Sequence, residues 1–238
     1  LVGAAERIIA RGKRIAAHLM EADEADIEFA DGTFRVAGTD RAIGIEELAR
    51  RSYLPGALPP GEELGLSALL VTRPGDATFP NGCHVCEVEV DPETGETALL
   101  SYVVVDDVGT VINPLLLKGQ IHGGVAQGFG QVFGECIRYA PESGQLLTAS
   151  FLDYAMPRAD ELCAMTVLNN PVPTATNPLG VKGAGEAGTV GALPALLGAV
   201  VDALRPLGVR HLDLPATPER VWAAIRRAPV TLEEWRKP

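Results

Sequence analysis

The sequence has 238 residues, of which 47% are hydrophobic and 21% charged, and its formal net charge is −11. This balance predicts a globular protein, and the negative charge argues against nucleic acid or an anionic membrane surface as a partner, because both require a basic face. No apolar run predicts a membrane span, since the longest, around 192–201, contains Pro194 and Gly198. The chain begins at Leu1 rather than Met, so we expect a fragment or a processed subunit.

The first third of the chain is expected to fold without carrying chemistry. Apolar residues recur at helical spacing over 4–20, and Asp31-Gly32 separates two short apolar runs, a pattern that predicts a β-hairpin over 27–36. The further elements expected here are a short helix over 45–52, a loop over 54–61 and a strand over 66–72. We interpret 1–238 as one region, with a possible division into sub-lobes of about 1–75 and 76–238.

A second hairpin is predicted over 83–105, and its first strand contains Cys83-His-Val-Cys86. The C-x-x-C spacing is compatible with a zinc half-site or a redox pair. In a strand, however, Cys83 and Cys86 point to opposite faces, and no second C-x-x-C completes a four-ligand zinc site. We therefore favour packed cysteines in a reducing compartment, which predicts a cytoplasmic protein, and we expect no metal ligands among the side chains.

Polar residues follow the second strand of this hairpin, at Asp106, Asp107 and Asn113. Side chains in this position often line a site, because loops carry function on a rigid scaffold. They also begin turns, and Asn113-Pro114 is a good turn initiator. The sequence leaves both interpretations open.

The next segment, 118–131, contains five glycines. Each costs a free helix about 1 kcal/mol relative to Ala, so the segment is either not helical or a helix that another group approaches closely. The segment also contains three side-chain amides, those of Gln120, Gln127 and Gln131. An amide both donates and accepts, which suits a heterocycle with mixed donor and acceptor edges, such as a pterin. The alternative is a tightly packed buried helix with glutamines at its rim.

Patterns further along predict the remaining elements. These are a third hairpin over 135–139 and from 146 onward, an ordered loop over 151–158, a strand over 165–168, a buried helix over 192–204, a strand over 209–212 and a helix over 219–227. Thr217 is expected to cap the last helix, because Pro218 and Glu219 follow it.

Residues 177–191 hold a single carboxylate, Glu186, among glycine, alanine and valine. A carboxylate in apolar surroundings has a raised pKa, which suits a general base that works near neutral pH. The alternative is a glycine-rich turn in which Glu186 merely caps the following helix.

Four segments, in this order, resemble one known family. They read Gly119-Gln-Ile-His-Gly-Gly-Val-Ala-Gln-Gly-Phe-Gly130, Phe151-Leu-Asp-Tyr154, Pro178-Leu-Gly-Val-Lys-Gly-Ala-Gly-Glu-Ala-Gly188 and Leu214-Pro-Ala-Thr-Pro-Glu-Arg-Val-Trp222. The chain resembles the molybdopterin-binding large subunit of the xanthine dehydrogenase, aldehyde oxidase and aerobic carbon monoxide dehydrogenase family. The resemblance covers essentially the whole chain, which corresponds to the C-terminal third of such a subunit.

The resemblance implies an α+β fold of mixed helices and mostly antiparallel hairpins, forming the C-terminal portion of a molybdenum hydroxylase large subunit. It implies that Glu186 is the catalytic base in the oxidative hydroxylation of an aldehyde or N-heterocycle, or in the oxidation of carbon monoxide. It also implies that Gln120 hydrogen-bonds the pterin. The further cofactor contacts that it implies are Asp107, Lys182, Gly183, Ala184 and Gly185.

The cofactor implied is molybdenum–molybdopterin in its cytosine dinucleotide form, with iron–sulfur clusters and FAD on partner chains. The partners implied are the rest of the large subunit, an iron–sulfur small subunit, an FAD medium subunit and a small-molecule substrate. The four scattered cysteines of this chain do not form an iron–sulfur site. The family's substrate contacts lie mostly outside this sequence, so the substrate class stays open.

Two hypotheses of different classes follow. The chain is either a catalytic piece of a molybdenum hydroxylase or a cofactor-free scaffold or assembly module with the same fold. Gln120 and Glu186 favour the first hypothesis, because a scaffold needs no carboxylate in an apolar glycine turn. A zinc protein built on Cys83 and Cys86 is a third alternative.

Overall fold

A computed structural model describes residues 1–73 and 75–235. The chain forms two compact units, Leu1–Pro74 and Gly75–Pro238, each with its own hydrophobic core. Helices and sheets are mixed and most strand pairs are antiparallel, which confirms the predicted α+β class.

The first unit packs helices on a small antiparallel sheet. Its elements are α1 (Val2–Leu19), β1 (Ile27–Ala30), β2 (Thr33–Val36), β3 (Ala42–Gly44) and α2 (Ile45–Arg51), and its short 3-10 helices are Glu24–Asp26 and Pro55–Ala57. The sheet order is β1-β2-β3. The apolar stripe of α1 buries Ile15 against the sheet, where Phe34 is fully buried. The first hairpin and both helices are as predicted.

The strand predicted over 66–72 is wrong. Those residues are not paired in a sheet, and their backbone carbonyls are bound by arginine side chains of α1 instead. Arg7 donates to the carbonyl of Leu69 over 3.1 Å, and Arg11 donates to that of Ser67 over 3.4 Å. Apolar alternation alone does not reveal whether a neighbouring strand or a side chain satisfies the backbone.

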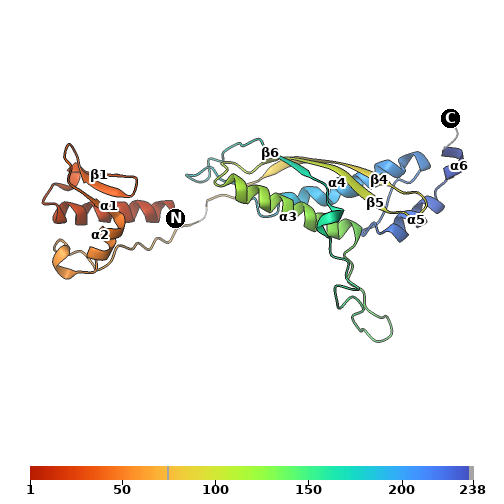
Figure 1. Ribbon diagram of the computed structural model, residues 1–238, viewed down its shortest axis with the longest axis horizontal. Coiled ribbons are helices and arrows are strands. Elements are labelled where there is room, and N and C mark those ends of the chain that lie inside the picture. Colours follow the sequence, from red (N-terminus) through yellow and green to blue (C-terminus); the bar gives the residue numbers. More distant parts are fainter. Residues whose placement is uncertain (74, 236–238) are drawn as a thin grey trace. The chain divides into compact units, whose positions relative to one another are not determined.

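The second unit places two long helices beside a three-stranded sheet (Figure 1). The strands are β4 (Asn81–Val90), β5 (Thr97–Asp107) and β6 (Met165–Asn169), and the helices are α3 (Pro114–Phe133), α4 (Ala187–Leu204), α5 (Pro218–Arg226) and α6 (Leu232–Trp235). Its 3-10 helices are Ala159–Glu161 and Arg205–Leu207. The sheet order is β4-β5-β6, with β4 antiparallel and β6 parallel to β5.

The glycine-rich segment is helical and forms α3, so of the two predicted alternatives for its structure, a helix that another group approaches closely is correct. Its glycines allow the backbones of α3 and α4 to approach closely. A Cβ on Gly124 would lie only 2.8 Å from the backbone nitrogen of Thr189, and one on Gly188 would lie 2.5 Å from the carbonyl oxygen of Ile121. The two helices therefore meet backbone to backbone at Gly124 and Gly188.

The stretch formed by α4 and the turn after it differs from the expectation that no run predicts a membrane span. Among the described residues, Ala187–Leu207 are long and apolar enough to cross a membrane, judged by length and composition only. Pro194 and Gly198 interrupt the apolar run but not the helix, which was predicted over 192–204. Its residues Leu196 and Val200 are fully buried in the core of the second unit.

Three smaller predictions need correction. The third hairpin is reduced to one isolated bridge between Tyr139 and Leu146, within a loop that extends away from the end of α3 (Figure 1). Residues 209–212 form no strand. Their apolar side chains, Val209 and Leu212, pack into the core from a segment without regular secondary structure. Thr217 lies at the N-cap of α5, but its side chain makes no capping hydrogen bond.

Candidate functional site

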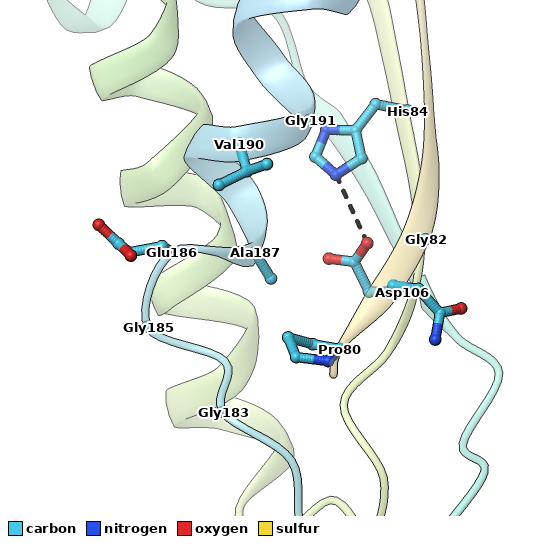
Figure 2. Close-up of a pocket in the computed structure, with 11 residues that line it drawn as sticks. Pro80, Gly82, His84, Asp106, Gly183, Gly185, Glu186, Ala187, Val190 and Gly191 are labelled. Atoms are coloured by element: carbon cyan, nitrogen blue, oxygen red, sulfur yellow. Dashed lines mark ion pairs between the residues drawn. The ribbon is translucent and has the colours of Figure 1, made fainter. Parts of the chain in front are cut away.

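The loop 182–186 and the first turn of α4 border a cavity of about 490 Å³. One wall of the cavity is formed by His84 of β4 and Asp106 of β5 (Figure 2). The facing wall contains Gly183, Gly185 and Glu186. The cavity thus lies where the open end of the β4–β5 hairpin, opposite its turn, meets the beginning of α4.

Glu186 occupies the N-cap position of α4, but its side chain makes no capping hydrogen bond. The alternative in which it merely caps the helix is therefore wrong. The carboxylate is exposed and points away from the side chains of His84 and Asp106 (Figure 2). The prediction of a carboxylate sheltered from water is also wrong for this chain, because Gly183 and Gly185 have no side chains to cover it.

Gln120 of α3 reaches the same loop. Its Nε2 donates to the carbonyl oxygen of Gly185 over 2.7 Å, so two residues that are 65 positions apart are joined directly beside Glu186. One helical turn further along, the hydroxyl of Thr189 donates to the carbonyl of Gly124 over 3.1 Å. The beginning of α4 is therefore fastened to α3 at two points.

Lys182 and Asp107 form a buried ion pair at the start of the loop. Lys182 Nζ lies 2.5 Å from Asp107 Oδ2, and the two side chains are 11% and 7% exposed. Asp107 Oδ1 accepts from the backbone N–H groups of Gly109 and Val172, both over 2.9 Å. Lys182, with these two N–H groups, holds the pKa of Asp107 far below its usual range. Within this chain Asp107 anchors the loop, and its predicted contact with a cofactor stays a prediction.

The Asp107 carboxylate predicts a loss of stability in acid. Its pKa is lower in the folded than in the unfolded protein, so the ionised form stabilises the fold above the unfolded pKa of about 4. This contribution is lost as the pH falls through the folded pKa. We expect thermal unfolding of Asp107→Asn to start at a lower temperature than wild type at pH of about 6, with a difference that narrows in acid. Parallel midpoint–pH curves for the two proteins would contradict this assignment.

The two cysteines of the C-x-x-C motif lie on opposite faces of β4, as predicted. Cys83 is exposed, whereas the Cys86 thiol faces inward and donates to the carbonyl of Ala195 over 3.3 Å. Burial raises the pKa of Cys86 to about 11, so its thiol stays protonated and unreactive. Two thiols on opposite faces of a strand cannot share one metal ion.

His84, a buried polar group of the cavity wall, was not predicted from the sequence. The ring of His84 lies between Tyr102, whose hydroxyl is 2.8 Å from Nδ1, and Asp106, whose Oδ1 is 3.4 Å from Nε2. A usable signal existed, because alternation along β4 places His84 on the same inward face as Cys86 and Val88. Asp106 was noted only as one of several polar residues at the strand end.

Comparison with known proteins gives consistent matches. A family model described as molybdopterin cofactor-binding domain matches residues 1–163. The chain is 36% identical over 224 residues to the carbon monoxide dehydrogenase large chain of Hydrogenophaga pseudoflava, and this match covers 94% of the chain and 28% of the relative. The chain is also 38% identical over 214 residues to the nicotine 6-hydroxylase large subunit of Paenarthrobacter nicotinovorans, a match that covers 89% of the chain and 26% of the relative.

A solved structure of reconstituted carbon monoxide dehydrogenase from Oligotropha carboxidovorans superposes with a TM-score of 0.81 and 36% identity, over 94% of this chain and 28% of that one. The fold and these matches define the class, that of molybdopterin-binding proteins. Within this class, the chain belongs to the large-subunit family of xanthine dehydrogenase, aldehyde oxidase and carbon monoxide dehydrogenase. The chain spans little more than a quarter of the length of these relatives, at 28% of the first.

Proposed function

We propose that this chain is the C-terminal portion of a molybdenum-dependent hydroxylase or dehydrogenase large subunit, in which Glu186 is the catalytic base. The observation that carries the proposal is the hydrogen bond from Gln120 to the carbonyl of Gly185, at 2.7 Å. It brings the amide that suits a pterin to the loop that bears the only carboxylate of 177–191. Glu186 lines the cavity, and Gln120 is bonded to another lining residue, Gly185.

The residues of this loop fit a heterocyclic cofactor. Gln120 uses Nε2 within the chain, and within the described residues no hydrogen bond involves its Oε1, which can accept from a ligand N–H. Glycines let the loop backbone approach a bound group closely. The residues that would hold molybdenum–molybdopterin, in its cytosine dinucleotide form, are Gln120, Asp107, Lys182, Gly183, Ala184 and Gly185. When bound, the cofactor supplies a redox centre that takes up two electrons from the substrate.

In this proposal Glu186 removes a proton during the reaction. Its carboxylate projects from a turn fixed on one side by α3 and on the other by the Lys182–Asp107 pair. A base held at a fixed position gains the advantage of proximity without reordering during turnover. The remainder of the large subunit would cover the carboxylate and exclude water, which this chain alone does not do.

The substrate class follows from the names of the relatives. One relative is named for carbon monoxide and another for nicotine, an N-heterocycle. We propose an N-heterocycle, an aldehyde or carbon monoxide as the substrate. An iron–sulfur small subunit and an FAD medium subunit would complete a cytoplasmic complex and carry the electrons away.

Cofactor content tests the proposal. The purified complex is expected to contain molybdenum and pterin in stoichiometric amounts, measured by elemental analysis and by fluorescence of the oxidised pterin. Gln120→Ala is expected to lower both by about threefold to tenfold, because one hydrogen bond is worth about 1 kcal/mol. Gln127→Ala, an exposed glutamine of the same helix, is the matched control and should retain both. A folded wild-type complex without molybdenum would support the scaffold alternative instead.

A further inference from the structure

His84 lies at the contact between the sheet and the beginning of α4. It extends inward from β4, directly opposite Val104 of β5, and its side chain is only 5% exposed. Tyr102 and Asp106 lie two positions before and after Val104 on β5, so they face the same way and reach the imidazole from both ends. The ring thus has a fixed position in the sheet.

The two polar contacts of the ring also fix its orientation. Burial raises the pKa of the Tyr102 hydroxyl, which therefore stays protonated and can donate to Nδ1 over 2.8 Å. A hydrogen on Nε2 then faces Asp106 Oδ1 at 3.4 Å. The Tyr102 ring meets the imidazole edge to face, with centroids 5.7 Å apart and planes at 89°. Rotation of the imidazole would break both polar contacts.

The backbone of α4 rests on this ring at Gly191. A Cβ on Gly191 would lie 2.5 Å from His84 Cδ2 and 2.6 Å from both Cγ and Cε1. Near-equal distances to three of the five ring atoms mean that this position faces the plane of the ring. Figure 2 shows the imidazole beside the helix at this point.

The first turns of α4 are therefore held from two sides. On the α3 side, Gly188 packs directly on the backbone, since a Cβ there would lie 2.5 Å from the carbonyl oxygen of Ile121. On the sheet side, Gly191 packs on His84. Glu186 precedes Gly191 by five residues, so about 7.5 Å of helix separates the ring from the carboxylate-bearing turn. The beginning of α4 is thus packed between the backbone of α3 and the ring of His84.

We propose that His84 is a positioning residue for Glu186, and that it acts through its contact with Gly191. The inference rests on the proposed role of Glu186 as base. Tyr102 and Asp106 hold the imidazole, the imidazole holds the beginning of α4, and the helix sets where the carboxylate meets the substrate. His84 itself touches neither the substrate nor the reacting atoms.

The test uses size-matched substitutions in the assembled complex, with kcat expressed per molybdenum. Gly191→Ala pushes the helix off the ring and is expected to lower kcat by about tenfold to 100-fold, because displacements near 1 Å can cost that much. Gly198→Ala adds the same methyl group in open space on the same helix and should leave kcat unchanged. His84→Ala lowers kcat too, but adding Gly191→Ala to it lowers kcat by less than about twofold further, because the ring that caused the clash is gone.

Tyr102→Phe adds no atom and keeps the aromatic ring, so it serves where Gly191→Ala fails to fold. It is expected to lower kcat about threefold or more, with KM and molybdenum content unchanged, since the imidazole loses one of its two polar contacts. A purely structural role would lower the yield of folded, loaded complex while kcat per molybdenum stayed constant, and that result overturns the proposal. Equal losses from Gly191→Ala with and without the His84 ring also overturn it.

Glu186→Gln, assayed in parallel, separates the two levels of inference. If that variant retains turnover, the proposed base is rejected. If it loses turnover while Gly191→Ala and Tyr102→Phe keep the wild-type kcat, the base stands and only the positioning role of His84 is rejected.

Discussion

Glu186→Gln is expected to lower kcat by about 10²–10⁴-fold while molybdenum and pterin content stay at the wild-type level. Glutamine has nearly the same shape as glutamate but cannot take up the proton. Cofactor retention should survive, because the proposed cofactor contacts come from Gln120 and from the loop that precedes Glu186. Steady-state rates with the enzyme's substrate, normalised to molybdenum, measure the effect.

Glu142→Gln provides the matched control for this substitution. Glu142 is an exposed glutamate in the long loop after α3, so the same chemical change there removes one negative charge far from the cavity. It should leave kcat unchanged. Near-wild-type turnover of Glu186→Gln, with the cofactor retained, would show that another group is the base.

The exposure of Glu186 is informative about what the complete site requires. Within this chain the carboxylate is surrounded by solvent, whereas a base that works near neutral pH is usually partly desolvated. Glycines at positions 183 and 185 leave room around it rather than cover. We therefore propose that the other wall of the site comes from the part of the large subunit that this chain does not contain. The chain would then supply a rigid platform and the base, while substrate selectivity would be determined elsewhere.

The sequence predicted individual elements better than contacts between them. Periodicity identified α1, the two hairpins of antiparallel strands and β6, because these patterns are local. It failed for 66–72, where arginine side chains rather than a strand bind the backbone carbonyls. The hydrogen bond between Gln120 and Gly185 depends on how two helices pack, so no spacing in the sequence could have predicted it.

The glycines of α3 show the same limit more sharply. The number of glycines predicted a close approach by another group, but the sequence did not indicate which group approaches or which glycines it contacts. Two adjacent glycines differ in the structure: a Cβ on Gly124 would meet the α4 backbone, whereas one on Gly123 would have nothing within 4 Å. Such a difference depends on which side of the helix faces its neighbour, and composition carries no information about it.

Gly124→Ala and Gly123→Ala should therefore have opposite effects on stability. Both substitutions gain up to about 1 kcal/mol of helix propensity. At Gly124 the new methyl group would lie 2.8 Å from the nitrogen of Thr189 and 3.0 Å from the Cα of Gly188, and neither backbone atom can rotate away. Overpacking of this kind costs about 1–3 kcal/mol, so we expect net destabilisation for Gly124→Ala and slight stabilisation for Gly123→Ala, measured by thermal unfolding.

The same substitution should also affect turnover, because the α3–α4 contact lies beside the proposed base. Separating the helices at Gly124 would stretch two hydrogen bonds. These are the bond from the Thr189 hydroxyl to the carbonyl of Gly124, now 3.1 Å, and the bond from Gln120 to the carbonyl of Gly185, now 2.7 Å. Gly124→Ala is therefore expected to lower kcat per molybdenum as well as stability, whereas Gly123→Ala should leave kcat unchanged. Equal stability and equal kcat for the two variants would mean that the helices have room to separate, and that their backbone contact does not hold Glu186 in place.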